Sequence, residues 1–282
     1  MTANPIFVTS AAPRSGTMLL QRLISSSQNG ICYGENTGER LRQICEFAHQ
    51  EMVAIQEHEP RHEAEWANVF EGNYDFWMVS LDLPGEFGKH ALVGAVTFYR
   101  QHFDEATRQI DKEVWATTVP SLNFSQIVKI ADLISDLKCI YMYRNVYDVI
   151  RSQKAENWIV NEERLVKACN RWVQNTDVIA ALMKKDFQNL PSMLHVVRYE
   201  DLIENRDATI AGIEAFGGLR GIKPEVADTP VDIREPASDP GTTPERADRE
   251  TAELTPEETG IIRAICGNRM QDLYPGHDPE RR

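Results

Sequence analysis

The feature that most constrains this chain is a short apolar run, followed by a glycine-containing turn and a helix-period pattern. Residues 5–10 (Pro-Ile-Phe-Val-Thr-Ser) are typical of a buried strand. The turn covers residues 11–17, and apolar residues then recur at helical spacing at Leu19, Leu20, Leu23 and Ile24. Strand, turn and helix in this order place free backbone N–H groups at the helix start, where they can bind an anion.

Later segments continue the alternation of strands and helices. Strands are predicted at 113–119, 138–143 and 193–197, and helices at 37–58, 91–111, 121–136, about 149–152, 161–187, 207–217 and 255–273. This order predicts one α/β domain over residues 1–282, with three layers: a central parallel sheet flanked by helices. The polar, proline-rich segment 224–254 is predicted to be a loop or flap over the ligand site, with a solvated linker as the alternative.

The stretch 59–90 is harder to interpret. It mixes aromatic residues with acidic ones and is interrupted by Pro84, Gly85 and Gly88. Its aromatic residues favour ordinary core, and the irregularity is also what an insertion that shapes a substrate pocket would show.

The charge balance limits the class of partner. The 282 residues carry 30 Lys and Arg against 43 Asp and Glu, for a formal net charge of -13. Attraction of nucleic acid or an anionic membrane to the whole surface is therefore disfavoured, and any anion must bind at a locally built site.

The cysteines and the N-terminus bear on compartment. Five dispersed cysteines without a C-x-x-C pair argue against a disulfide framework and a structural zinc site, and Cys139 falls in an apolar run typical of core. No segment has the length of a signal peptide core or a membrane span. We therefore expect a cytoplasmic protein.

The turn after the first strand resembles a P-loop without its signature. The P-loop pattern would need Gly, Gly, Lys and Ser or Thr at positions 11, 16, 17 and 18, where the chain has Ala11, Gly16, Thr17 and Met18. An ordinary NTPase is therefore disfavoured. Arg14 together with the N–H groups of Ser15, Gly16, Thr17 and Met18 could still hold a phosphate, and this arrangement requires no metal.

A second candidate anion site follows the strand at 138–143. Arg144 stands at the strand end and Ser152 lies eight residues later, on the next predicted helix. A guanidinium and a hydroxyl placed in this way can converge on one phosphate.

These motifs resemble those of sulfotransferases that use 3′-phosphoadenosine 5′-phosphosulfate (PAPS). Pro13-Arg14-Ser15-Gly16-Thr17 is similar to the 5′-phosphosulfate loop of tyrosylprotein and bacterial carbohydrate sulfotransferases. Arg144 and Ser152 are similar to the family's 3′-phosphate pair, and residues 198–202 (Arg-Tyr-Glu-Asp-Leu) to a segment whose tyrosine lies against the adenine. The resemblance implies a P-loop NTPase-like sulfotransferase fold. It also assigns Tyr199 to the adenine, with a buried structural tyrosine as the alternative; Glu200 and Asp201 are expected to cap the following helix.

The resemblance also implies a catalytic base. Gly34-Glu35-Asn36-Thr37 is similar to the G-E-E-T segment that carries the base of the tyrosylprotein enzymes, which makes Glu35 the candidate here. The alternative is a carboxylate that caps the next helix. Arg14 would neutralise the transferring group.

The chain departs from the family at one place. Residues 116–118 are Ala-Thr-Thr, where many members have a Lys or His that assists transfer. Arg14 or a flap residue would then do more of the electrostatic work, and His90 and His102 are alternative bases. The flap arginines Arg234, Arg246 and Arg249 match no family position.

The predicted function is transfer of a sulfuryl group from PAPS to a hydroxyl of a small-molecule or carbohydrate acceptor, releasing PAP (3′-phosphoadenosine 5′-phosphate). The alternatives are a tyrosylprotein-type sulfotransferase, a P-loop kinase or NTPase, and a non-catalytic nucleotide-binding protein. The sequence does not identify the acceptor.

Overall fold

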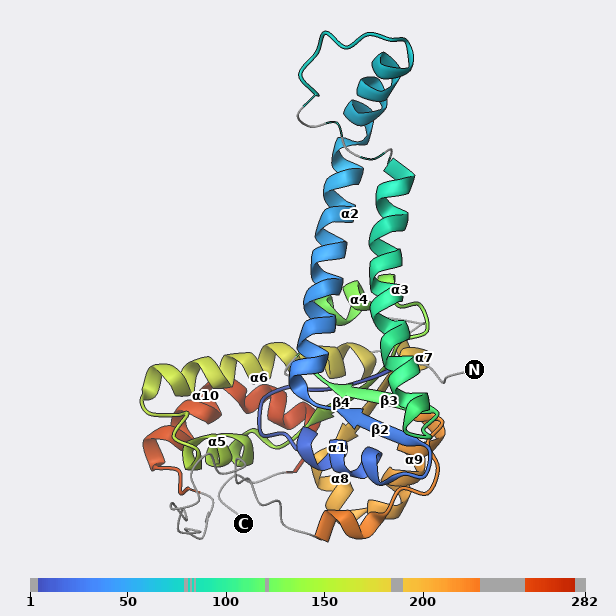
Figure 1. The fold of residues 1–282 in the computed structure, drawn as a ribbon. Helices are drawn as coiled ribbons and strands as arrows, with labels where there is room; N and C mark the ends of the chain where they lie inside the picture. The colour runs from blue at the N-terminus through green and yellow to red at the C-terminus, as the bar shows by residue number, and fades with distance from the viewer. Residues whose placement is uncertain are drawn as a thin grey trace, which may run out of the picture.

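A computed structural model describes residues 5–78, 81, 83, 85–119, 122–183, 190–228 and 252–276. They contain a five-stranded sheet with helices on both faces (Figure 1). The order across the sheet is β2-β3-β1-β4-β5, and every pair of neighbouring strands is parallel. The predicted three-layer α/β architecture is confirmed. The strands are β1 (Ile6–Ser10), β2 (Gly30–Tyr33), β3 (Val114–Thr118), β4 (Lys138–Tyr143) and β5 (Leu194–Arg198).

The central strands are buried on both faces. In β1, Phe7 belongs to one hydrophobic cluster, whereas Ile6 and Val8 belong to the other. In β4, Tyr141 and Ile140 divide between the same two clusters. Side chains of a strand alternate between its faces, so a continuous apolar run is what a sheet covered on both sides requires.

Two sets of helices supply these clusters. The smaller set covers the face of Ile6 and Val8 and consists of α1 (Thr17–Ser26), α8 (Tyr199–Glu204) and α9 (Arg206–Gly217). The larger set covers the other face and consists of α2 (Glu35–Phe70), α3 (Gly85–Gln109), α4 (Phe124–Leu133), α5 (Val146–Ala155), α6 (Glu162–Met183) and α10 (Pro256–Leu273). Two short elements, α7 (Leu190–Met193) and η2 (Pro224–Asp228), complete the description. None of the helices in these described ranges is long and apolar enough to cross a membrane.

Several helix ends lie where the residue types predict them. Thr255 and Glu258 form a capping box at the start of α10. The Asn161 side chain accepts a hydrogen bond from the Arg164 N–H just before α6. Gly218, with φ of 68°, ends α9 in the left-handed conformation.

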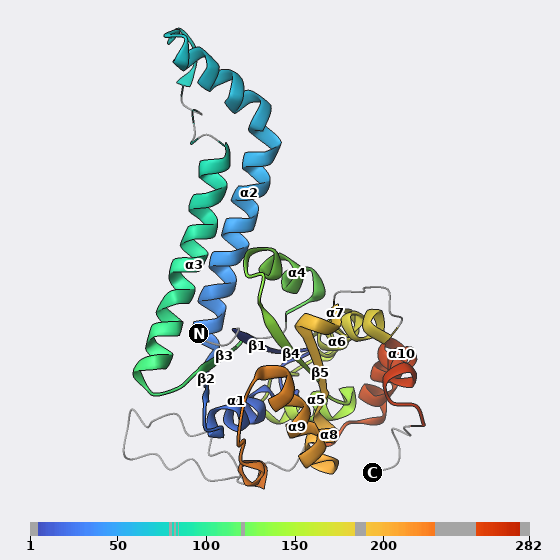
Figure 2. The ribbon, with the colours of Figure 1, turned by 90° about the vertical axis from the view of Figure 1, so that its right-hand side faces the viewer.

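The largest correction concerns α2 and α3. The helix predicted to end at residue 58 continues to Phe70, and within the stretch 59–90, which the sequence left open, a second helix begins at Gly85. Figures 1 and 2 show α2 and α3 as a long hairpin that projects from the body. Pro60 cannot donate to the Gln56 carbonyl, but both residues are exposed, so water can satisfy that carbonyl and the helix continues.

Three aromatic residues of the 59–90 stretch are exposed, whereas the sequence analysis favoured core positions for them. Phe70 is 79% exposed, Tyr74 61% and Trp77 74%. Phe70 is the last residue of α2, and Tyr74 and Trp77 lie between α2 and α3.

Candidate active site

The loop between β1 and α1 has an unusual backbone. Arg14 has φ of 74° and Gly16 has φ of 101°, whereas Ser15 between them has no positive φ. Left-handed residues in a turn of this kind can direct successive N–H groups toward one side, which is how concave anion sites form. A left-handed arginine costs of the order of 1 kcal/mol or more and persists only where surrounding contacts hold it.

Helix α1 begins directly after this loop and adds further donors. The Leu20 N–H donates to the Gly16 carbonyl at 3.1 Å. The N–H groups of Thr17 and Met18 therefore precede the first intrahelical bond and are free to bind an anion. Ser15 is fully buried, and within the described residues its hydroxyl has no hydrogen-bond partner.

The Arg14 side chain reaches helix α5. Its Nε donates to Ser152 Oγ at 3.0 Å, and its Nη2 lies 3.1 Å from Glu156 Oε1. Its guanidinium is also 6.0 Å from the ring centre of Trp158. The two candidate phosphate sites are therefore joined by Arg14, which belongs to the first and contacts Ser152 of the second.

Arg144 lies at the carboxyl end of β4, on the other side of the same loop. Its Nη1 donates to the Arg14 carbonyl at 3.3 Å, and its guanidinium stacks over Tyr199, 4.3 Å from the ring centre. Trp172 Nε1 holds the Arg144 carbonyl at 3.0 Å. The buried Nε of Arg144 has no hydrogen-bond partner among the described residues.

Tyr199 closes the loop from the β5 side. A Cβ at Gly16 would overlap its ring, with Tyr199 Cε2 at 2.8 Å, so only glycine permits this approach. The ring thus lies between the loop and the Arg144 guanidinium.

The expected capping role of Glu200 and Asp201 is wrong. Glu200 accepts from the Asn145 N–H at 3.0 Å and from the Tyr274 hydroxyl at 3.0 Å, and Asp201 pairs with Arg198. Burial, followed by the Glu200 charge, raises the pKa of Tyr274, so its hydroxyl stays protonated as a donor. Glu200 therefore ties α10 to the turn after Arg144.

Glu35 lies at the same edge of the sheet, beyond β2. It is the first residue of α2 and its side chain is exposed. The cap residue is Gly34, which has no side chain, so the capping alternative for Glu35 does not hold. Strands lie about 4.8 Å apart and β3 separates β2 from β1, so β2 is about 10 Å from the strand that carries the loop. Among the described residues, no side-chain hydrogen bond or ion pair joins Glu35 to the residues around Arg14.

Two buried threonines stand at positions 117 and 118, where the chain departs from the family motif. Thr117 Oγ1 donates to the Gly34 carbonyl and Thr118 Oγ1 to the Tyr33 carbonyl, both at 3.4 Å. They fix the end of β2, which leads directly to Glu35.

The alternative bases His90 and His102 are on α3, and His102 Nδ1 donates to the Phe98 carbonyl within that helix at 3.0 Å. The flap arginines Arg234, Arg246 and Arg249 lie outside the described residues.

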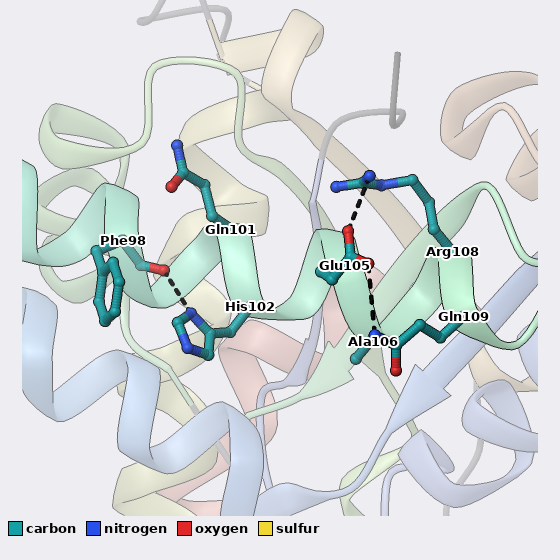
Figure 3. Close-up of a pocket in the computed structure, with 7 residues that line it drawn as sticks. All are labelled: Phe98, Gln101, His102, Glu105, Ala106, Arg108 and Gln109. Atoms are coloured by element: carbon teal, nitrogen blue, oxygen red, sulfur yellow. Dashed lines mark hydrogen bonds and ion pairs between the residues drawn. The ribbon is translucent and has the colours of Figure 1, made fainter.

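One surface hollow is remote from this cluster. Figure 3 shows it on α3, where Phe98, His102, Glu105 and their neighbours line it. This end of α3 leads into the amino end of β3, whereas the loop lies at the carboxyl end of β1. The hollow therefore does not belong to the candidate active site.

The structure thus brings Arg14, Ser15, Gly16, Arg144, Ser152 and Tyr199 together, with Thr17 and Met18 beside them on α1. The sequence analysis missed Glu156 and Trp158, which contact Arg14. Their position, four and six residues after Ser152 and just past the end of α5, was the available signal.

Comparison with known proteins places these residues in a family context. A model of the sulfotransferase family matches residues 5–223. A search of curated proteins finds no match.

Several solved structures are similar at low sequence identity. The sulfotransferase domain from the Synechococcus PCC 7002 olefin synthase is 16% identical with a TM-score of 0.47, and the match covers 94% of this chain and 95% of that chain. A mouse sulfotransferase complexed with PAP is 14% identical with a TM-score of 0.45, covering 96% of this chain and 89% of that one. A sulfotransferase from Mycobacterium avium is 12% identical with a TM-score of 0.46, covering 100% and 79%.

Proposed function

The chain belongs to the sulfotransferase family, and on this premise we propose that it transfers a sulfuryl group from PAPS to a hydroxyl of a small-molecule or carbohydrate acceptor and releases PAP. The observation that carries the proposal is the cluster of Arg14, Ser152, Arg144 and Tyr199 around one loop at the carboxyl edge of the sheet. Ligands of open parallel sheets bind at this edge.

The residues present fit a donor with phosphate groups at both ends. The N–H groups of residues 15–18 and the Arg14 guanidinium would hold the 5′-phosphosulfate, because they supply hydrogen-bond donors and positive charge at a helix start. Arg144 and Ser152 would hold the 3′-phosphate, and Tyr199 would lie against the adenine. The buried Ser15 hydroxyl, which lacks a partner in the described part of the chain, supports this assignment.

The acceptor proton needs a base. When PAPS is bound, it supplies a sulfur whose bond to the 5′-phosphate oxygen breaks as a bond to the acceptor oxygen forms. Glu35 would take the proton that this oxygen loses, which an exposed carboxylate at the site edge can do. Arg14 would stabilise the negative charge on the transferring and departing oxygens. Glu156 now pairs with Arg14, so an incoming anion competes with that carboxylate.

Thermal unfolding with PAP tests the donor assignment. We expect PAP at millimolar concentration to raise the melting temperature in the absence of Mg²⁺, since the anchors are protein groups and binding to the folded state stabilises it. ATP with Mg²⁺ is the comparison for the kinase or NTPase alternative. No shift with PAP, or a larger shift with Mg²⁺ and ATP, contradicts the proposal.

Glu35→Gln extends this experiment to the chemical step. The variant should keep the PAP-induced shift and lose at least about tenfold in transfer from labelled PAPS to a panel of hydroxyl acceptors. Glu51→Gln, which alters another exposed carboxylate of α2, is the control. Transfer by Glu35→Gln at the rate of the control assigns the base to another residue.

A further inference from the structure

The loop that carries Arg14 is held by its carbonyl groups. The carbonyls of residues 11 to 14 each accept a hydrogen bond from a side chain. The donors are Asn175 Nδ2 to Ala11 at 2.8 Å, Ser10 Oγ to Ala12 at 2.9 Å, Gln153 Nε2 to Pro13 at 3.0 Å and Arg144 Nη1 to Arg14 at 3.3 Å.

These bonds determine where the N–H groups point. A trans peptide is planar, so a carbonyl and the N–H of the next residue point in opposite directions. The bond from Gln153 to the Pro13 carbonyl therefore sets the direction of the Arg14 N–H. In the same way, the bond from Arg144 to the Arg14 carbonyl sets the direction of the Ser15 N–H.

Gln153 differs from the other donors in its position. It follows Ser152 on α5, and Ser152 Oγ accepts from Arg14 Nε at 3.0 Å. Helix α5 thus holds Arg14 at two points, through its side chain and through the carbonyl that precedes it. Gln153 is only 5% exposed, so little water is available to replace its amide at the Pro13 carbonyl.

A side-chain amide is well suited to hold the Pro13 carbonyl beside an anion site. It donates to the carbonyl without placing a negative charge beside an anion site, which a carboxylate would do. The left-handed backbone of Arg14, with φ of 74°, is the strained conformation that such contacts have to maintain.

We infer that Gln153 is a positioning residue for the anion-binding loop: it keeps Arg14 left-handed and directs the Arg14 N–H toward the 5′-phosphosulfate. The identity of that ligand rests on the proposed function, whereas the effect on the loop does not. Asn175 acts in the same way on the Ala11 carbonyl, from α6, and its own carbonyl is held by the Tyr141 hydroxyl at 2.8 Å.

The test compares two nucleotides in Gln153→Met, which keeps the approximate size of the side chain and removes the donor. PAP carries the 5′-phosphate that the loop would bind, and adenosine 3′-monophosphate lacks it. We expect titration calorimetry to show about a tenfold loss of PAP affinity and a change of less than about twofold for adenosine 3′-monophosphate. A merely structural role would not separate the two ligands.

Asn29→Leu is the matched control. Asn29 has a buried side-chain amide that donates to the Gly218 carbonyl at 2.9 Å. It directly precedes β2, so it lies at the amino ends of the parallel strands, whereas the loop lies at their carboxyl ends. This variant should lose stability without separating the two nucleotides. If Gln153→Met does not fold, Gln153→Leu provides the same comparison, since it also lacks a donor and adds no charge.

A crystal structure of the unliganded variant gives a second measurement that needs no nucleotide. We expect the 13–14 peptide to rotate and Arg14 to leave the positive-φ region. A left-handed Arg14 in the variant, or equal losses of affinity for the two nucleotides, overturns the inference. If the wild-type protein binds no PAP, the proposed function fails, and the position of Arg14 in the variant still decides the role of Gln153.

Discussion

At the scale of single residues, the contact between Gly16 and Tyr199 carries two constraints at one position. Gly16 has a positive φ, which disfavours any residue with a Cβ, and the Tyr199 ring occupies the space that the Cβ would need. Both constraints act at the loop between β1 and α1, because the Tyr199 ring that restricts position 16 also stacks on Arg144.

Gly16→Ala should therefore be more costly than an ordinary glycine substitution. The left-handed conformation costs about 1 kcal/mol and overpacking against Tyr199 adds about 1–3 kcal/mol, for a total loss of about 2–4 kcal/mol in the free energy of unfolding. Urea denaturation measures this loss.

Gly218→Ala is the matched control for the backbone effect alone. Gly218 has φ of 68°, and no atom lies within 4 Å of a Cβ placed there, so its loss should be about 1 kcal/mol. In a Tyr199→Ala background the cost of Gly16→Ala should approach that of the control. An unchanged cost in that background would show that the ring does not restrict position 16.

The residues of the candidate site could be predicted where a strand end places them. Arg14 and Arg144 follow adjacent parallel strands, and their positions at the sheet edge follow from that order alone. Gln153 and Asn175 could not be predicted as loop contacts, because they are 140 and 164 residues from the carbonyls they bind. Only the packing of α5 and α6 against the loop brings them there.

At the scale of elements, the contact between β5 and α9 includes a titratable group. His195 on β5 stacks on Phe216 of α9 with 5.2 Å between ring centres, and its Cε1 and Nε2 lie 3.5 Å from the position of a Cβ at Gly212. Burial disfavours the charged imidazolium and lowers the pKa of His195 in the folded state.

This shift predicts the pH dependence of stability. Below the unfolded-state pKa of about 6.5, the unfolded chain binds a proton that the folded chain resists, so this contribution to stability is present above that pH and is lost as the pH falls toward the folded-state pKa. His195→Gln should remove it. Urea unfolding between about pH 7 and pH 5 should show the stability of the wild type falling toward that of the variant.

The control for this experiment is His90→Gln, which removes an exposed imidazole on α3. A constant difference between wild type and His195→Gln across the pH range would show that His195 does not titrate differently on folding.

The elements differ in how well periodicity predicts them. The buried strands β1 and β4 were predicted because uninterrupted apolar runs are typical of a sheet covered on both faces. Strand β2 was missed because it has only four residues. The end of α2 was misplaced because Pro60 normally ends a helix, whereas here the interrupted turn is solvent-exposed.

At the scale of the whole molecule, the net charge of -13 contrasts with the proposed donor, which is itself anionic. Positive charge for the donor is supplied locally, by two arginines that follow adjacent strands and by the N–H groups at the start of α1. A heavily sulfated or phosphorylated polymer would be repelled by most of this surface, which favours a neutral or small acceptor.

The central claim is that the residues around the loop bind both the 5′-phosphosulfate and the 3′-phosphate of PAPS. The variant Arg144→Ala tests this claim most directly. Titration calorimetry would compare PAP with adenosine 5′-phosphosulfate, which lacks the 3′-phosphate. The charged contact should be worth about 1.5–3 kcal/mol, so we expect PAP to bind at least about tenfold more weakly.

The second nucleotide and a control variant make this measurement decisive. Adenosine 5′-phosphosulfate should lose less affinity for Arg144→Ala than PAP does, since only PAP loses the 3′-phosphate contact, whereas both nucleotides are affected by loss of the bond to the Arg14 carbonyl and of the stacking on Tyr199. Arg151→Ala, which breaks the pair with Asp148 on α5, should leave both affinities near those of the wild type. Selective loss of PAP binding is the predicted result, and equal losses for the two nucleotides would contradict the account.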